Sequence, residues 1–248
     1  MPFLINGERE SSMQASYNHP LFGPLVYSFE GTENDYKRGA EIEFSSGFDP
    51  ADVTKVYVPQ MVGIEGLRDG RFWFHKQGHA QLKMAFAELQ RLDLMKHVVE
   101  TAGSLYQRLR KPYNDAGKEV KSILPSNHSF GIAVDLNPHA ANHGETTAPL
   151  APIFLALGFT WGVTFNDPMH FEVAQFIADP QPVTPEELAA CEQLAMQQLQ
   201  AYKDRLAKAR RHSRGIAASH GIVASDSMPE SEEESLWYAD EHDDDASA

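Results

Sequence analysis

The sequence has little cysteine and no long apolar run, and each shortage excludes a class of protein. Cys191 is the single cysteine of 248 residues, so the chain can form neither an internal disulfide nor a thiolate metal cage. No apolar stretch approaches the roughly 20 residues that span a bilayer. The N-terminal segment lacks the basic head and apolar run of a secretory signal peptide. We therefore expect a soluble protein that is synthesised in the cytoplasm without a signal peptide and has no transmembrane segment.

Basic residues are scarce relative to acidic ones. The sequence holds 21 Lys and Arg against 35 Asp and Glu, which gives a formal net charge of −14. Ten of the acids follow residue 225, where there is no Lys or Arg, so much of the charge belongs to a tail. This balance argues against a nucleic-acid partner. With 42% hydrophobic residues, the rest of the chain has enough apolar material for a folded core.

Composition divides the chain into four parts. Residues 1–48 are predicted to form an irregular or β-rich lead-in, 49–180 a central domain, 181–214 a C-terminal helix and 215–248 an acidic disordered tail. The helix begins at Thr184-Pro185-Glu186-Glu187, where Thr184 and Glu187 can form a capping box and Pro185 suits the first helical position.

Residue periodicity in the central domain changes repeatedly between strand-like and helix-like. Strands are predicted over 53–62, 71–74, 97–106, 131–136, 159–165 and 170–173. An apolar stripe predicts a helix from about residue 77, and a second, short helix covers 152–157, ended by Gly158. Loops are expected over 111–125 and 139–149. The predicted fold is α+β, with a small, mainly antiparallel sheet flanked by helices.

Two imidazoles and two carboxylates stand in a pattern typical of a metal site. His128 precedes a strand that carries Asp135, and His170 lies on a later strand, three residues after Asp167. Antiparallel pairing brings side chains on one face within about 5 Å, so the first three groups can converge. Without thiolate, such ligands indicate a catalytic zinc site open to water, with Asp167 as a spare acid. Alternatively, the histidines are ordinary polar residues, Asp135 a turn or sheet-edge acid and Asp167 a turn residue.

The residues around this constellation resemble a known signature. The order Ser-x-His-x-x-Gly-x-Ala-x-Asp, then aromatic-Gly, then Asp-x-x-His is met by Ser126, His128, Gly131, Ala133, Asp135, Trp161, Gly162, Asp167 and His170. This pattern is similar to that of the zinc D-alanyl-D-alanine carboxypeptidase and L-alanyl-D-glutamate endopeptidase family. Its members cut peptidoglycan stem peptides and are related to the hedgehog signalling domain. The resemblance covers about residues 50–175 and implies one zinc ion on His128, Asp135 and His170, with Asp167 as catalytic acid/base.

The resemblance also implies residues that surround the metal. The family carries an arginine shortly before the first histidine, for which Arg108 is the best match and Arg110 a rival. Such an arginine could hold a substrate carboxylate or the developing oxyanion. Ser126 and Trp161 are candidates for substrate binding, although Trp161 could instead belong to the core. Glu172 could accept a hydrogen bond from the ligand His170 and so orient its ring, or it could be a solvated strand residue.

By this resemblance, the expected function is hydrolysis of an amide in peptidoglycan stem peptides. The sequence Asp-Pro-Met-His-Phe-Glu at 167–172 and the missing signal peptide look most like phage-type endolysins, which favours an L-alanyl-D-glutamate endopeptidase. The alternatives are a D-alanyl-D-alanine carboxypeptidase, a non-catalytic module that binds wall peptides, and a secreted antibacterial effector. The protein would act on the cell wall after release or delivery. The basic end of its C-terminal helix could contact the wall or a membrane.

Overall fold

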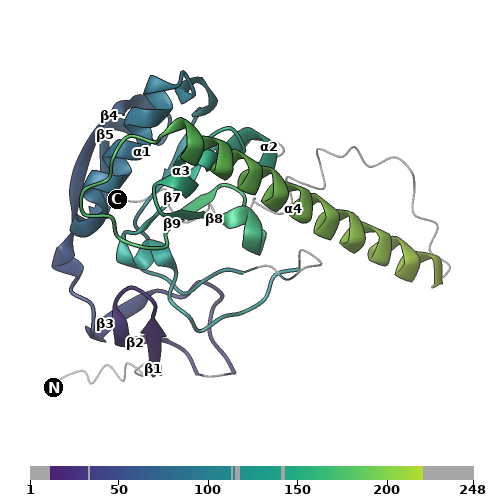
Figure 1. Ribbon diagram of the computed structural model, residues 1–248. Helices are drawn as coiled ribbons and strands as arrows, with labels where there is room; N and C mark the ends of the chain where they lie inside the picture. Colours follow the sequence, from purple (N-terminus) through teal and green to yellow (C-terminus); the bar gives the residue numbers. More distant parts are fainter. Residues whose placement is uncertain (1–11, 33, 113, 115–117, 141–142, 220–248) are drawn as a thin grey trace.

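The computed structural model describes residues 12–219 except 33, 113, 115–117 and 141–142. Within these residues the chain forms three antiparallel sheets and four α-helices (Figure 1). This confirms the predicted α+β class. No helix in the described part of the chain has the length and apolar character that a membrane span needs. The predicted acidic tail from residue 220 onward lies outside the described residues.

The N-terminal part is a three-stranded sheet of β1 (Ser12–His19), β2 (Gly23–Glu30) and β3 (Ile42–Ser46), in that order. Strand alternation turns Leu25, Tyr27 and Phe29 of β2 inward, where they are buried. Leu25 belongs to the main core of the molecule, and Phe22 and Phe48 pack against that core. The sheet is therefore joined to the rest of the protein by shared apolar contacts.

A long two-stranded ribbon and one helix form the next part. Strands β4 (Val53–Ile64) and β5 (Leu67–His75) pair antiparallel. Helix α1 (His79–Arg91) follows, and its predicted apolar stripe is buried, namely Leu82, Ala85, Phe86 and Leu89. Phe72 of the ribbon stacks on Phe86 with ring centroids 5.9 Å apart. Ribbon and helix thus bury their apolar faces against each other. These faces follow from the alternation of side chains along a strand and from the 3.6-residue repeat of a helix.

The third sheet has four short strands. Its order is β6 (Thr101–Gly103), β7 (Ala133–Leu136), β9 (His170–Val173) and β8 (Phe159–Trp161), with every pair antiparallel. Two short helices, α2 (His143–Thr147) and α3 (Ala151–Ala156), lie between β7 and β8 in sequence. Phe154 of α3 stacks on Phe171 of β9 with centroids 4.4 Å apart, so α3 covers one face of the sheet.

Helix α4 (Pro185–Ser219) begins as the sequence predicts. Thr184 Oγ1 accepts a hydrogen bond from the Glu187 N–H at 3.2 Å, and Glu187 Oε2 accepts one from the Thr184 N–H at 2.9 Å. The predicted capping box is therefore formed. The helix runs past the predicted end at residue 214 as far as Ser219, and its distal half projects away from the body (Figure 1).

Three local predictions were wrong. The strand expected over 97–106 is only β6, because Met95–His97 form a 3-10 turn. The loop expected over 139–149 contains α2. The strand expected over 159–165 stops at Trp161, because Gly162–Phe165 form a 3-10 turn that Asn166 closes in the left-handed region at φ +68°.

Candidate metal centre

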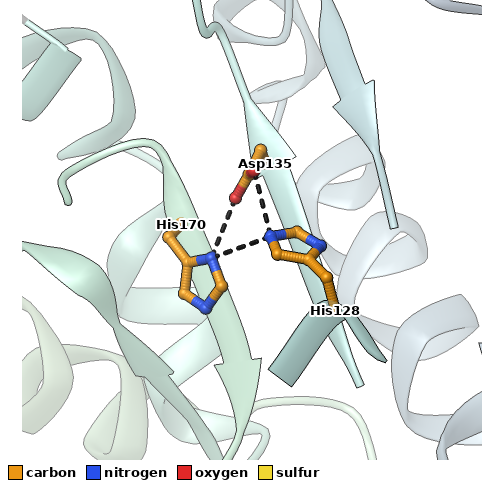
Figure 2. Close-up of side chains that lie close together, drawn as sticks. All are labelled: His128, Asp135 and His170. Atoms are coloured by element: carbon orange, nitrogen blue, oxygen red, sulfur yellow. Dashed lines mark hydrogen bonds and ion pairs between the residues drawn. The ribbon is translucent and has the colours of Figure 1, made fainter. Parts of the chain in front are cut away.

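Three buried side chains meet on one face of the third sheet (Figure 2). Asp135 of β7 and His170 of β9 are direct cross-strand partners. His128 comes from the 3-10 turn Asn127–Phe130 that leads into β7. The relative exposures of His128, Asp135 and His170 are 2%, 3% and 5%. The structure thus brings together the three residues that the sequence predicts as metal ligands.

Gly131 explains how the His128 turn reaches this position. It has a left-handed φ of +59°, and a Cβ atom there would lie 2.7 Å from Val53 Cγ1. Only glycine combines this conformation with so close an approach. The chain can therefore leave the turn at Gly131 and enter β7 directly, with His128 directed at Asp135.

The donor atoms have separations that suit a single metal ion. His128 Nε2 lies 3.0 Å from Asp135 Oδ2 and 3.1 Å from His170 Nδ1, and His170 Nδ1 lies 2.9 Å from Asp135 Oδ1. Tetrahedral zinc with bonds of about 2.0 Å places its ligand atoms about 3.3 Å apart. The three donors therefore need to separate by only a few tenths of an ångström to hold zinc. Two imidazoles and one carboxylate are also a ligand set found in catalytic zinc sites.

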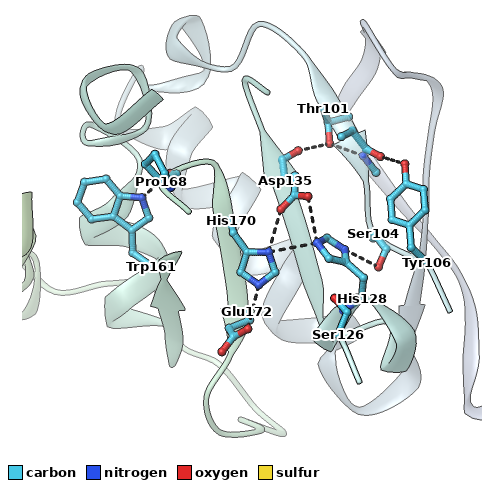
Figure 3. Close-up of polar contacts among 12 residues, drawn as sticks. Thr101, Ser104, Tyr106, Ser126, His128, Asp135, Trp161, Pro168, His170 and Glu172 are labelled. Atoms are coloured by element: carbon cyan, nitrogen blue, oxygen red, sulfur yellow. Dashed lines mark hydrogen bonds and ion pairs between the residues drawn. The ribbon is translucent and has the colours of Figure 1, made fainter. Parts of the chain in front are cut away.

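The outward nitrogen of each histidine is held by an acceptor (Figure 3). His128 Nδ1 lies 3.3 Å from the Ser104 carbonyl oxygen, and His170 Nε2 lies 2.9 Å from Glu172 Oε2. An N–H directed at each acceptor leaves the inner nitrogens, His128 Nε2 and His170 Nδ1, free to donate lone pairs to a metal. Glu172 thus hydrogen-bonds the ring nitrogen of His170 that points away from the other two predicted ligands, which is one of the two roles that the sequence predicts for it.

The charges of this site favour a cation at its centre. Burial alone would raise the pKa of Asp135, but His128 and His170 hold that pKa well below its ordinary value. Burial also opposes charge on His170, yet its bonds to Asp135 and Glu172 raise its pKa well above the ordinary value. Because the carboxylates stabilise a positive charge between them, a divalent ion that displaces the His170 proton meets the same attraction.

The turn that carries Asp167 is anchored by backbone contacts. The Asp167 carbonyl accepts from the His170 N–H at 3.1 Å, and the Asp167 N–H donates to the Gly162 carbonyl at 3.0 Å. A Cβ atom on Gly162 would lie 2.0 Å from the Asp167 carbonyl oxygen, so glycine is required there. Asp167 is half-buried and lies one turn before the ligand His170.

The two arginine candidates lie on the segment that precedes the His128 turn. The Arg108 N–H donates to Ser129 Oγ at 3.0 Å, and its guanidinium carbon lies 5.9 Å from the centre of the Tyr106 ring. Arg110 Nε donates to the Pro125 carbonyl at 2.9 Å, and the charge of Arg110 helps to lower the pKa of Glu172. Both arginines are partly exposed, and the charge of Arg110 acts on Glu172, which hydrogen-bonds the predicted ligand His170.

Trp161 lies in the core, which is one of the two roles that the sequence leaves open for it. Its side chain has no exposed surface, and its indole Nε1 donates to the Pro168 carbonyl at 2.7 Å. Ser126 is also buried, and its Oγ accepts from the His128 N–H at 3.4 Å, which caps the turn that carries the ligand. Both signature residues therefore shape the site from within the protein.

Several supporting residues escaped the sequence analysis. Thr147 Oγ1 donates to the same Pro168 carbonyl at 2.8 Å, and Thr101 Oγ1 donates to the Asp135 carbonyl at 2.6 Å. Arg205 of α4 donates to Asn166 Oδ1 at 3.2 Å, next to Asp167. No local pattern marks these residues, because each acts through a partner that is distant in sequence.

Comparison with known proteins agrees with this geometry. A buried His-Asp-His set on an antiparallel sheet defines the protein as a candidate metalloprotein of mixed α+β fold. The family model described as D-alanyl-D-alanine carboxypeptidase matches residues 120–173. This match confirms the resemblance over a segment that contains His128, Asp135, Asp167 and His170. No curated protein and no solved structure gave a match.

Proposed function

We propose that this protein is a zinc peptidase that hydrolyses an amide bond of peptidoglycan stem peptides. The observation that carries the proposal is the convergence of His128, Asp135 and His170, buried and spaced for one metal ion, within a segment that matches a peptidase family. The acid Asp167, one turn away, adds a group that a purely structural zinc site does not need.

The residues of the site divide the chemistry between them. A zinc ion bound there would supply a water of lowered pKa and a charge that polarises the substrate carbonyl. His128, Asp135 and His170 would hold the ion, with Ser104 and Glu172 fixing the two rings. Asp167 would accept a proton during attack on the carbonyl and pass it to the leaving amine.

An arginine near the site would bind the anionic substrate. Stem peptides carry carboxylates, and the guanidinium group pairs with carboxylates through two parallel hydrogen bonds. Arg108 and Arg110 are both close in sequence to the His128 turn. Arg108 is our choice on the family pattern, and Arg110, whose charge helps to lower the pKa of Glu172, is the alternative.

Within this class we favour an L-alanyl-D-glutamate endopeptidase of endolysin type, because residues 167–172 resemble that group. The description of the matching family favours the second candidate, a D-alanyl-D-alanine carboxypeptidase. Purified sacculi digested with the zinc-loaded protein separate the two. A new α-amino group on D-glutamate supports the endopeptidase, and released D-alanine supports the carboxypeptidase.

The same experiment tests the remaining candidates. Stoichiometric zinc without any cleavage of murein would favour a module that only binds wall peptides. An antibacterial effector would share the peptidase chemistry and differ in its route to the wall, for which we propose release or delivery from the cytoplasm. Asp167→Asn is the matched control, because it removes the proton acceptor and leaves the three zinc ligands in place.

A further inference from the structure

The C-terminal helix contacts the turn that leads to Asp167. Arg205 lies near the middle of α4, outside the segment that matches the family model. Its Nη2 donates to the Val163 carbonyl at 2.5 Å, and its Nε donates to Asn166 Oδ1 at 3.2 Å. One guanidinium group thus holds both the 3-10 turn Gly162–Phe165 and the residue that closes it.

The side chain of Asn166 is held on both sides. Because an arginine side chain has donors and no acceptor, the amide oxygen of Asn166 must face Arg205. The amide nitrogen then donates on the other side, to the Asn114 carbonyl at 3.3 Å. The backbone of Asn166 is in the left-handed region at φ +68°, which asparagine adopts more readily than most residues. Side chain and backbone therefore fix together the direction in which the chain leaves the turn.

Asp167 follows directly, and its backbone connects the turn to a predicted metal ligand. Its N–H donates to the Gly162 carbonyl at 3.0 Å, and its carbonyl accepts from the His170 N–H at 3.1 Å. The position of the Asp167 side chain relative to His170 therefore depends on where the turn lies. Phe165, at the end of the turn, is 42% exposed, so apolar packing holds this end only in part and the hydrogen bonds of Arg205 supply the rest.

We propose that Arg205 is a positioning residue of the site, acting through Val163 and Asn166 on the carboxyl group of Asp167. The inference rests on the proposed function and gives α4 a role in it. A proton acceptor works only within hydrogen-bond distance of the proton that it takes. Arg205 fixes the turn so that Asp167 is held ready for this transfer. The first half of α4 is then part of the working site and not an appendage to it.

Attachment of α4 to the body of the protein is the competing role for Arg205. Lys203, two positions earlier, serves such a role, because its Nζ lies 2.6 Å from Glu145 Oε1 of α2. This ion pair joins α4 to α2 and not to the turn before Asp167. Lys203→Met is therefore the matched control, since it removes a cation and a polar contact from the same stretch of helix.

The test is the cleavage of a synthetic stem peptide that carries both candidate bonds, by the full chain at saturating zinc, with kcat separated from KM. Arg205→Met should lower kcat about tenfold to a hundredfold, because a misplacement of about 1 Å at a reacting group has an effect of that size. Arg205→Lys keeps the charge and one donor and should lose less. Lys203→Met should keep the wild-type kcat. Zinc affinity, measured by competition with a chromophoric chelator, should stay at the wild-type value in all three variants, because pairing with Asp135 holds His170 in β9.

A second substitution shows whether Arg205 acts through Asp167. Asp167→Asn removes the group that Arg205 positions. In that background Arg205→Met should change the residual kcat by less than about twofold, since effects that pass through one group do not add. A helix contact that only stabilises the fold would lower kcat by the same factor in both backgrounds.

The outcomes separate this inference from the proposed function. An unchanged kcat in Arg205→Met, or a full further loss in the Asp167→Asn background, overturns the positioning role. A zinc affinity that falls as far as kcat also overturns it, because the effect is then on the metal. Should Arg205→Met not fold, Asn166→Gly keeps the left-handed backbone and removes the acceptor, and a wild-type kcat there overturns the inference. A wild type that binds zinc and cleaves neither bond refutes the proposed function, and the inference with it.

Discussion

The Pro168 carbonyl offers a direct test of how the turn between Asp167 and His170 is held. Pro168 lies between Asp167 and His170, and its carbonyl accepts from Thr147 Oγ1 at 2.8 Å and from Trp161 Nε1 at 2.7 Å. Both donors are fully buried. We consider Thr147→Val, Trp161→Phe and the double variant, because each single change keeps a similar shape and removes one donor.

The structure predicts that the two changes are not additive. Thr147→Val removes one hydrogen bond while the carbonyl keeps the other, so it should lower the free energy of unfolding by about 1 kcal/mol. Trp161→Phe loses the same amount for its bond plus about 1–2 kcal/mol for the smaller ring in a buried site. In the double variant the buried carbonyl has neither donor, which should cost about 1–2 kcal/mol beyond the sum of the single effects.

Urea unfolding of the four proteins in the presence of a chelator measures this coupling without a contribution from bound metal. The zinc affinity of each variant gives a second measurement, since a loosened turn should also weaken the hold of His170 on the ion. Free energies that add to within about 0.5 kcal/mol, with an unchanged zinc affinity, would show that the carbonyl does not hold the turn.

Three further predictions concern the acid, the pH dependence and the last helix. Asp167→Asn should keep its zinc and lose murein cleavage by about 10²- to 10⁴-fold, and wild-type turnover would rule out this proton acceptor. Burial opposes the charge on His170 but its two carboxylate partners raise its pKa, so zinc must displace a proton. Zinc affinity should therefore rise with pH through the neutral range, and a flat profile would contradict the protonation of His170 in the metal-free site. Thr184→Ala should lower the free energy of unfolding by about 1 kcal/mol through loss of the capping box, whereas unchanged urea stability would argue against it.

The sequence predicts the metal ligands through the family signature that it resembles, and the geometry of each ligand fits simple rules of strand pairing and turns. Alternation along β7 directs Asp135 to one face, and antiparallel pairing with β9 sets His170 opposite it. Gly131 marks the turn that brings in His128. The start of α4 is likewise predicted from a local signal, the capping box formed by Thr184 and Glu187.

Other parts depend on contacts that no local pattern reveals. His19 meets Asn127 across 108 positions, and its partner could only be found once the N-terminal sheet was placed. The burial of Trp161 depends on how α3 and the sheet close over it, because a tryptophan can serve equally in a core or at a surface. Helix α2 is also set by tertiary structure, since the buried hydroxyl of Thr147 is fixed by the Pro168 carbonyl.

Metal analysis of the full chain tests the central claim most directly. The protein should be dialysed against zinc and then against buffer, beside His128→Ala, with both checked for the same secondary structure. The geometry predicts one zinc ion per wild-type chain and far less in the variant, because three donors are needed to hold the ion. A wild type without zinc, or a variant that holds as much as the wild type, would contradict the assignment of His128, Asp135 and His170 as a metal site.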